Sequence, residues 1–275
     1  MEKNKVFYNV SKYILGLFFI AYYRPKFKNT NLIPKDGPII VCGNHIHLYD
    51  QCLPILSTKR MLHYMAKKEY FDSKMAWFFK KSGCISVDRE NHGGTSKEIA
   101  LDILNNGYAL GIYPEGTRNS LVCKDEKLNE IYEYVKDEVE FKKFKKLMKK
   151  NQTTVSQINL LLELKNNKKI SRNEFKKSVY NVDKSLKEFV NKNIITETEY
   201  ENSLLLPIKY GVVSFAEKTN ATIVPYAITG KYKFLNNNLK ITFAKPFKIG
   251  KMSLEDANEL LKEEITEIIR EKNLE

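Results

Sequence analysis

The segment IIVCGNHIHLYD, residues 39–50, decides the fold. Its first five residues, 39–43, form a continuous apolar run after the turn-forming cluster PKDGP at 34–38, which predicts a buried strand of a parallel sheet. Polar residues, among them His45 and Asp50, follow at once. Ligands of open α/β sheets bind beyond the carboxyl ends of the strands, so we expect chemistry at this point of the chain.

Further strand and helix patterns lie on both sides of this segment. Apolar strands are predicted at 62–66, 84–87, 109–113, 222–228 and 239–243, and helices at 71–81, about 95–105, 207–219 and 253–272. Repeated strand–helix–strand units of this length predict an α/β fold with a mostly parallel sheet and helices on both faces. A chain of 275 residues is long enough for one such domain with an insertion.

The alternation stops at 121–203, where the sequence is charged, helical in character and poor in Gly and Pro. Two stretches there, 161–175 and 186–200, resemble one another at a spacing of 25 residues. Each contains an apolar helix and then a Ser/Thr-x-x-Glu helix start followed by an aromatic residue, which indicates a degenerate repeat of a helical hairpin. We therefore expect three parts: an N-terminal membrane-docking helix (1–30), an α/β domain (31–120 with 204–275), and a charged helical insertion (121–203).

The apolar run YILGLFFIAYY at 13–23 has eleven residues, too few for the roughly 20 that span a bilayer. No small-residue cleavage site follows it, which argues against a signal peptide. Basic residues flank the run and tyrosines lie at its edges, as in a helix that lies within one leaflet. The alternative is a helix packed on the protein's own core.

The chain carries a formal net charge of +13, which suits a polyanionic partner such as anionic lipid or nucleic acid, or reflects codon usage alone. The four cysteines include no C-x-x-C pair. Their spacing predicts neither a zinc site nor a disulfide framework, and it favours reduced thiols on the cytosolic side of the membrane.

His45 and Asp50 can form an imidazole–carboxylate pair if the chain turns between them. The carboxylate would fix the tautomer of His45 and stabilise the imidazolium that forms when the ring takes a proton. No serine or cysteine nucleophile is needed if a substrate hydroxyl attacks. Alternatively, His45, His47 and Asp50 could bind zinc. The chain has only two other histidines and no Cys/His cluster, so we expect no metal.

Two further polar clusters follow predicted strands. The residues Glu115-Gly-Thr-Arg118 combine close backbone approach, a hydroxyl and a forked cation, which together suit a phosphate group. Asp88 and Arg89 follow another strand, although these two side chains could simply pair with each other. Three polar clusters at three strand ends predict one shared site.

In this order, the clusters resemble the motifs of the glycerolipid acyltransferases, of the 1-acyl-sn-glycerol-3-phosphate acyltransferase (PlsC) type. The matching residues are Asn44-His45-x4-Asp50, Gly83-x-Ile85-x-Val87-Asp88-Arg89, Pro114-Glu115-Gly116-Thr117-Arg118 and Ile223-Val224-Pro225, with weaker matches at 31–34, 66–69 and 206–211. The resemblance covers roughly residues 30–120 and 204–250.

The resemblance implies a sheet of about seven strands with helices on both faces, preceded by a membrane-docking helix. It implies that His45 is the general base on the acceptor hydroxyl and that Asp50 orients it. The donor would be an acyl-CoA or acyl carrier protein thioester, and no cofactor is expected. The residues implied to hold the acceptor phosphate are Glu115, Gly116, Thr117 and Arg118, with Arg89 and Lys67 assisting.

The implied acceptor is lysophosphatidate, with glycerol-3-phosphate or another lysophospholipid as alternatives. We expect the enzyme on the cytoplasmic face of the cell membrane, bound to anionic lipid and without a nucleic-acid partner. A different class, a non-catalytic basic membrane- or nucleic-acid-binding protein, explains the charge but leaves His45, Asp50 and residues 115–118 without a role.

The sequence departs from the family pattern at two places. His47 stands where these enzymes often carry Ser, which leaves the acceptor preference open. The insertion at 121–203 separates two motifs that the family joins by a short connection. We expect it to form a helical lid or docking arm whose Lys142–Lys150 face meets anionic membrane or an acidic acyl carrier protein. The alternative is a solvated charged bundle tolerated in a surface loop.

Overall fold

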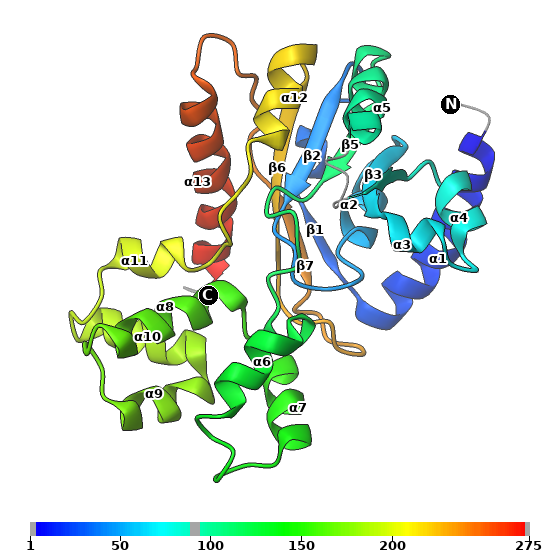
Figure 1. The fold of residues 1–275 in the computed structure, drawn as a ribbon. Helices are drawn as coiled ribbons and strands as arrows, with labels where there is room; N and C mark the ends of the chain where they lie inside the picture. The colour runs from blue at the N-terminus through cyan, green and yellow to red at the C-terminus, as the bar shows by residue number, and fades with distance from the viewer. Residues whose placement is uncertain (1–3, 89–93, 273–275) are drawn as a thin grey trace. The chain divides into compact units, whose positions relative to one another are not determined.

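The computed structural model describes residues 4–88 and 94–272 and contains a seven-stranded sheet of order β1-β7-β6-β2-β5-β3-β4 (Figure 1). The strands are β1 (Lys26–Lys28), β2 (Ile39–Gly43), β3 (Leu62–Lys67), β4 (Ile85–Val87), β5 (Ala109–Ile112), β6 (Thr222–Thr229) and β7 (Lys240–Phe243). Only β6 and β7 pair antiparallel in the described sheet. The predicted fold class is confirmed. Strand β1 is not predictable from the sequence, because its three residues include two lysines and form no apolar run.

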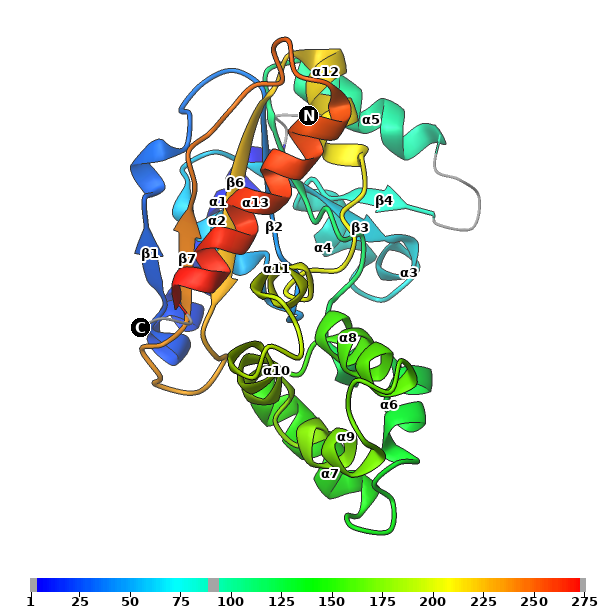
Figure 2. The same ribbon diagram turned by 90° about the vertical axis from the view of Figure 1, so that its left-hand side faces the viewer.

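Helices cover both faces of the sheet (Figure 2). These helices are α1 (Lys5–Tyr23), α2 (Cys52–Ser57), α3 (Lys68–Phe71), α4 (Ala76–Lys81), α5 (Gly94–Asn105), α12 (Gly211–Thr219) and α13 (Leu254–Lys272). Ile39 and Val41 of β2 face a core that includes Phe19 of α1 and Leu53 of α2. On the other face, α13 contacts β6, and α12 contacts β2 and β6. All five residues of β2 are buried, as expected for a strand covered on both sides.

Two predicted helices differ from the structure. The expected helix at 71–81 is instead α3 and α4, because Ser73 lies between them and bonds the backbone amides of Met75 and Ala76. The expected helix at 207–219 begins only at Gly211. In the segment before the helix, the Lys209 amide donates a 2.9 Å hydrogen bond to the Pro114 carbonyl. This segment therefore bonds to a distant part of the chain instead of forming a helical turn.

The chain divides into two compact units. The first contains the sheet and consists of Met1–Asn44, Leu48–Gly116 and Ile208–Glu275. The second consists of His45–His47 and Thr117–Pro207. Its helices are α6 (Asp125–Tyr132), α7 (Phe141–Asn151), α8 (Val155–Asn166), α9 (Arg172–Val179), α10 (Val182–Asn191) and α11 (Glu197–Asn202). They enclose a core of their own, with side chains such as Phe144, Phe175 and Leu186 fully buried.

The second unit contains the same helix start twice. Ser171 accepts from the Glu174 amide at 3.2 Å, and the Glu174 carboxylate accepts from the Ser171 amide at 2.8 Å. Thr196 and Glu199 form the same reciprocal pair at 3.1 and 2.7 Å. Both are capping boxes, as the sequence predicts. The pairs α8–α9 and α10–α11 thus use one local pattern at two places in the chain.

Helix α1 has one buried and one exposed side. Tyr8, Gly16 and Phe19 are buried, and a Cβ added at Gly16 would have to displace the Leu56 side chain. Apolar side chains such as Phe18, 70% exposed, cover the opposite side. The buried side agrees with the alternative of a helix packed on the protein's own core, and membrane contact by the exposed side stays a prediction. Among the described helices, none combines the length and apolarity needed to cross a membrane.

Candidate active site

The predicted polar clusters of the first unit lie along one edge of the sheet. Strands β2, β5, β3 and β4 are successive parallel neighbours, so their carboxyl ends share that edge. Asp50 follows β2, Glu115 follows β5, Lys67 ends β3, and Asp88 follows β4. Four strand ends thus bring residues from distant parts of the sequence to the edge where ligands of α/β proteins bind.

Asp50 is fully buried, in the turn before α2. The hydroxyl of Tyr232 donates a 2.6 Å hydrogen bond to its Oδ1. Burial raises the pKa of Tyr232 well above its usual value, and the negative charge of Asp50 raises it further. The phenol therefore stays protonated and remains a donor to the carboxylate. Sequence reasoning missed Tyr232, which lies beyond β6 and belongs to none of the recognised motifs.

Asn44 ties the end of β2 to β6. Its side-chain amide donates to the Ile228 carbonyl at 3.0 Å and accepts from the Ile228 amide at 2.7 Å. These two bonds continue the β2–β6 ladder one residue beyond Gly43, the last paired residue of β2. Gly43 has no side chain where the backbone and ring of Tyr226 approach it. The backbone is consequently fixed immediately before His45.

His45 is half-buried and belongs to the second unit. Its carbonyl accepts a 2.6 Å hydrogen bond from the Asn119 amide, one residue after Arg118. Asn119 is itself buried, and its side chain donates to the Ser156 hydroxyl at 2.8 Å and accepts from the Ser156 amide at 3.1 Å. Asn119 therefore joins the main chain of His45 to the first turn of α8. No sequence pattern distinguishes Asn119 from an ordinary loop residue.

The four residues 115–118 divide between the two units. In the first, Glu115 is buried and Gly116 has a positive φ of 68°. The side chain of Lys209 lies against Gly116, since a Cβ built at that glycine would be 3.1 Å from the lysine Nζ. The structure thus adds Lys209 to the candidate phosphate ligands. In the sequence, Lys209 belongs only to the weak motif match at 206–211.

In the second unit, Thr117 and Arg118 are half-buried. The Lys124 ammonium donates a 2.9 Å hydrogen bond to the Thr117 hydroxyl. This contact places a further cation beside the predicted phosphate-binding residues.

Two predicted phosphate ligands remain, Lys67 and Arg89, and the structure describes only the first of them. Lys67 is exposed at the end of β3, opposite Val87 of β4. Its neighbour Lys68 forms a 3.0 Å ion pair with Asp88. Arg89 lies outside the described residues, as does the Asp88–Arg89 pairing considered as an alternative.

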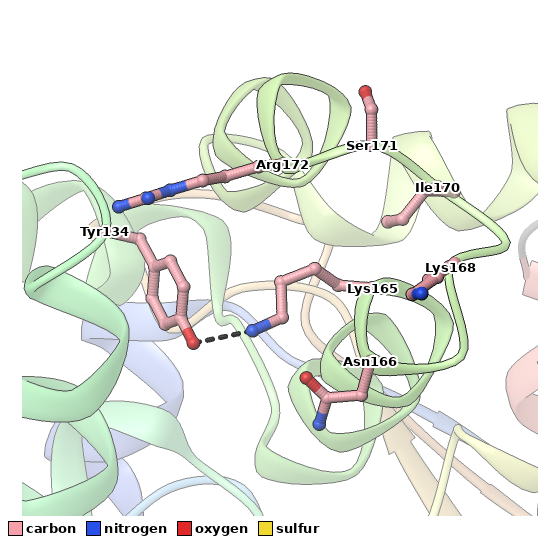
Figure 3. Close-up of a pocket in the computed structure, with 7 residues that line it drawn as sticks. All are labelled: Tyr134, Lys165, Asn166, Lys168, Ile170, Ser171 and Arg172. Atoms are coloured by element: carbon pink, nitrogen blue, oxygen red, sulfur yellow. Dashed lines mark hydrogen bonds between the residues drawn. The ribbon is translucent and has the colours of Figure 1, made fainter.

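A cavity of about 700 Å³ lies in the second unit (Figure 3). Its lining residues are Tyr134, Lys165, Asn166, Lys168, Ile170, Ser171 and Arg172. The Lys165 ammonium donates to the Tyr134 hydroxyl at 2.6 Å, and the Ser171 hydroxyl serves the capping box. No predicted catalytic or phosphate-binding residue lines this cavity. Within residues 4–88 and 94–272, no three His, Cys, Asp or Glu side chains are grouped to hold a metal.

Known proteins match this chain in sequence and in fold. The family model for acyltransferases matches residues 24–229. Over 97 residues the chain is 36% identical to the 1-acyl-sn-glycerol-3-phosphate acyltransferase of Bacillus subtilis (strain 168). That stretch covers 34% of this chain and 49% of the relative, so the chain spans about half of the relative's length. The crystal structure of the 1-acyl-sn-glycerophosphate (LPA) acyltransferase PlsC from Thermotoga maritima aligns with a TM-score of 0.53 and 14% identity, covering 100% of this chain and 80% of that one.

Proposed function

The chain belongs to the acyltransferase family, and we propose that it moves a fatty acyl group from acyl-CoA or acyl carrier protein to the free hydroxyl of 1-acylglycerol-3-phosphate. The acceptor oxygen forms an ester bond to the acyl carbon, and the carbon–sulfur bond of the thioester breaks. The hydroxyl proton passes through His45 to the departing thiolate. The products are phosphatidate and a free thiol, so no cofactor is consumed.

The observation that carries this proposal is the buried carboxylate of Asp50, which lies five residues after His45 in the sequence. The hydroxyl of Tyr232 donates a hydrogen bond to this carboxylate. A carboxylate that orients an imidazole selects the tautomer with a free ring nitrogen and stabilises the imidazolium that forms on proton uptake. His45 is accordingly the proposed base and Asp50 its orienting group. The family match and the relative from B. subtilis support the same reaction class.

For the acceptor phosphate, the proposed ligands are the backbone around Gly116, the Thr117 hydroxyl and Arg118. Lys209 joins them because its side chain lies against Gly116. A planar guanidinium and a flexible ammonium are both groups that suit a phosphomonoester. Glu115 is buried, so we assign it to shaping this turn rather than to direct phosphate contact.

The exposed side of α1 is the proposed membrane contact. Val6, Val10, Leu17 and Phe18 are all at least half-exposed, while Tyr8 and Phe19 face the core. An apolar helix face that the protein leaves uncovered suits insertion into one leaflet. We propose that this contact brings the enzyme to a lipid acceptor at the cytoplasmic face of the membrane.

The insertion is the proposed docking arm, and α7 carries the relevant charge. Lys143 pairs with Glu140 and Lys145 with Asp125, both on the surface. Four other lysines of the helix are exposed and form no ion pair among the described residues: Lys142, Lys146, Lys149 and Lys150. At 3.6 residues per turn these four share one face, opposite the buried Phe144 and Met148. Such a face suits anionic lipid or an acidic carrier protein.

Thiol release from acyl-CoA and from acyl carrier protein tests the reaction, with lysophosphatidate, glycerol-3-phosphate and other lysophospholipids as acceptors. His45→Ala should abolish transfer, whereas the matched control His47→Ala should retain it with altered acceptor preference. Wild-type transfer by His45→Ala would show that the assignment of the base is wrong. If thiol is released only with glycerol-3-phosphate, then glycerol-3-phosphate is the acceptor and the proposed acceptor is wrong.

Changing the four unpaired lysines of α7 to Gln tests the docking arm. If the arm meets a carrier protein, KM for acyl carrier protein rises while KM for acyl-CoA stays unchanged. If it meets lipid, binding to anionic vesicles falls instead. When neither quantity changes, the insertion is a solvated bundle without a docking role.

A further inference from the structure

A second cavity, of about 310 Å³, lies in the first unit. Its lining residues are Lys5, Lys35, Lys59, Arg60, Met61, His63, Tyr108 and Ala109. Half of these eight side chains carry a permanent positive charge, and none is acidic. The cavity is therefore strongly electropositive, and neither the proposed reaction nor the recognised motifs account for it.

Its position separates it from the candidate active site. The residues precede or begin β2, β3 and β5, which are neighbours in the sheet, so the cavity lies at the amino edge of the strands. Asp50, Glu115 and Lys67 lie at the opposite edge. A strand of four to six residues extends about 13–20 Å, so a small ligand cannot reach both edges.

Arg60 is held by two hydrogen bonds to backbone carbonyls. Its guanidinium is half-buried and donates to the Gly107 carbonyl at 2.8 Å and to the Pro34 carbonyl at 3.4 Å. Desolvation lowers the pKa of Arg60, with the nearby Asp36 acting in the opposite direction. The two carbonyls fix the orientation of the guanidinium while leaving several of its five N–H donors for a ligand.

The other polar groups converge on the same space. Lys35 and Lys59 are exposed and form no ion pair among the described residues. His63 is buried, and its Nδ1 lies 2.9 Å from the Gly83 carbonyl. Nδ1 must donate in that contact, which leaves Nε2 as the second polar atom of the ring.

We infer that this cavity binds a phosphate group. A fixed guanidinium beside exposed ammonium groups, here those of Lys35 and Lys59, is the donor set that proteins use for phosphate oxygens. Lys5 begins α1, so the cavity lies beside the helix whose exposed face suits a membrane. The phosphate can therefore come from a lipid headgroup or from solution, and the experiment distinguishes these two sources.

The first measurement uses the full chain and inorganic phosphate. NMR signals of the His63 ring, assigned with a His63→Gln variant, report on this cavity, because His63 lines it and neither His45 nor His47 does. We expect a saturable shift in the wild type that disappears in Lys35→Gln/Lys59→Gln. The control Lys97→Gln/Lys218→Gln removes the same charge from exposed positions outside the cavity and should keep the shift.

The second measurement is binding to phosphatidylcholine vesicles that contain either phosphatidylglycerol or oleate at equal surface charge. A lipid source predicts that the cavity variant loses affinity only for the phosphatidylglycerol vesicles. The cavity variant loses the contacts of two ammonium groups with the headgroup phosphate, so its affinity for these vesicles should fall about tenfold or more relative to the control. If the phosphate comes from solution, inorganic phosphate shifts the His63 signal, but the cavity variant shows no selective loss of affinity for the phosphatidylglycerol vesicles.

Two results would overturn the inference. One is a His63 signal that inorganic phosphate does not move in the wild type, together with equal vesicle binding by the cavity and control variants. The other is an equal loss by both variants on both kinds of vesicle, which would indicate net charge alone. Neither measurement involves acyl transfer, so failure of the proposed reaction would leave this test unaffected.

Discussion

The hydroxyl of Tyr232 donates a 2.6 Å hydrogen bond to the buried carboxylate of Asp50, although 182 positions separate the two residues. The ring of Tyr232 also packs against Phe19 and Tyr23 of α1, with ring centroids 6.4 and 5.5 Å apart. One side chain thus contacts both the proposed orienting carboxylate and the last turns of the proposed membrane helix. The position of α1 on the core therefore bears on the geometry of Asp50.

Tyr232→Phe should lower kcat about tenfold or more and leave KM for both substrates nearly unchanged. The substitution removes one hydrogen bond to a buried charged group, an interaction that contributes roughly 1.5–3 kcal/mol, while it keeps the ring contacts with α1. Steady-state kinetics with a thermal unfolding curve measure this effect. Tyr210→Phe, at an exposed tyrosine, is the matched control. An unchanged kcat in Tyr232→Phe would show that the hydroxyl of Tyr232 does not contribute to the reaction.

Asn119→Ala should lower both stability and kcat. It removes the two side-chain hydrogen bonds to Ser156 and leaves buried polar groups without partners, which costs about 1–3 kcal/mol each. The backbone that bonds the His45 carbonyl then loses its support. Denaturant unfolding and kcat are the measurements, and Asn106→Ala at an exposed position is the control. A stability loss with unchanged kcat would show that His45 does not depend on this link.

Gly116→Ala should raise KM for the acceptor and destabilise the fold by about 1–2 kcal/mol, the usual cost of a left-handed backbone for a residue with a Cβ. The new methyl group would also displace Lys209. Gly37→Ala separates these effects, because Gly37 has a similar φ of 74° and no neighbour within 4 Å of an added Cβ. A rise in KM that is equal in both variants would exclude Lys209 as a phosphate ligand.

Leu17→Glu/Phe18→Glu should reduce binding to neutral phosphatidylcholine vesicles on the order of a hundredfold. Burying two large apolar side chains contributes about 3 kcal/mol or more, and both residues point away from the core. Co-sedimentation measures the change. Ile99→Glu/Tyr210→Glu places the same charges on exposed apolar residues outside α1 and should bind as the wild type does. Equal binding by both variants would show that α1 is not the membrane contact.

The protein should lose stability as the pH rises above about 10. Burial raises the pKa of Tyr64, Tyr113, Tyr226 and Tyr232 above the ordinary value of 10.0. Because these pKa values are higher in the folded state, the protonated phenols favour folding below that pH, and their contribution disappears above it. Tyrosinate absorbance and circular dichroism should therefore change together. If all tyrosines ionise near pH 10 while the dichroism stays constant, these four phenols are accessible to solvent.

Local patterns in the sequence predicted several elements to within a residue or two. The run 39–43 is β2 itself, because a strand covered on both faces needs five consecutive apolar residues. The capping boxes at Ser171 and Thr196 were equally predictable, since both partners lie within one helical turn. Element ends were less predictable where a distant contact intervenes, as the bond between Lys209 and Pro114 shows.

The sequence by itself therefore determined the α/β class, the strand that precedes His45 and Asp50, and the edge of the sheet where polar residues follow the strands. Each of these follows from periodicity and from residues close together in the chain. Only the tertiary structure decided that Tyr232 holds Asp50, that Asn119 joins His45 to α8, and that Lys209 lies against Gly116. Such contacts join segments that approach one another only after the strands are ordered and packed, and no local pattern encodes that order.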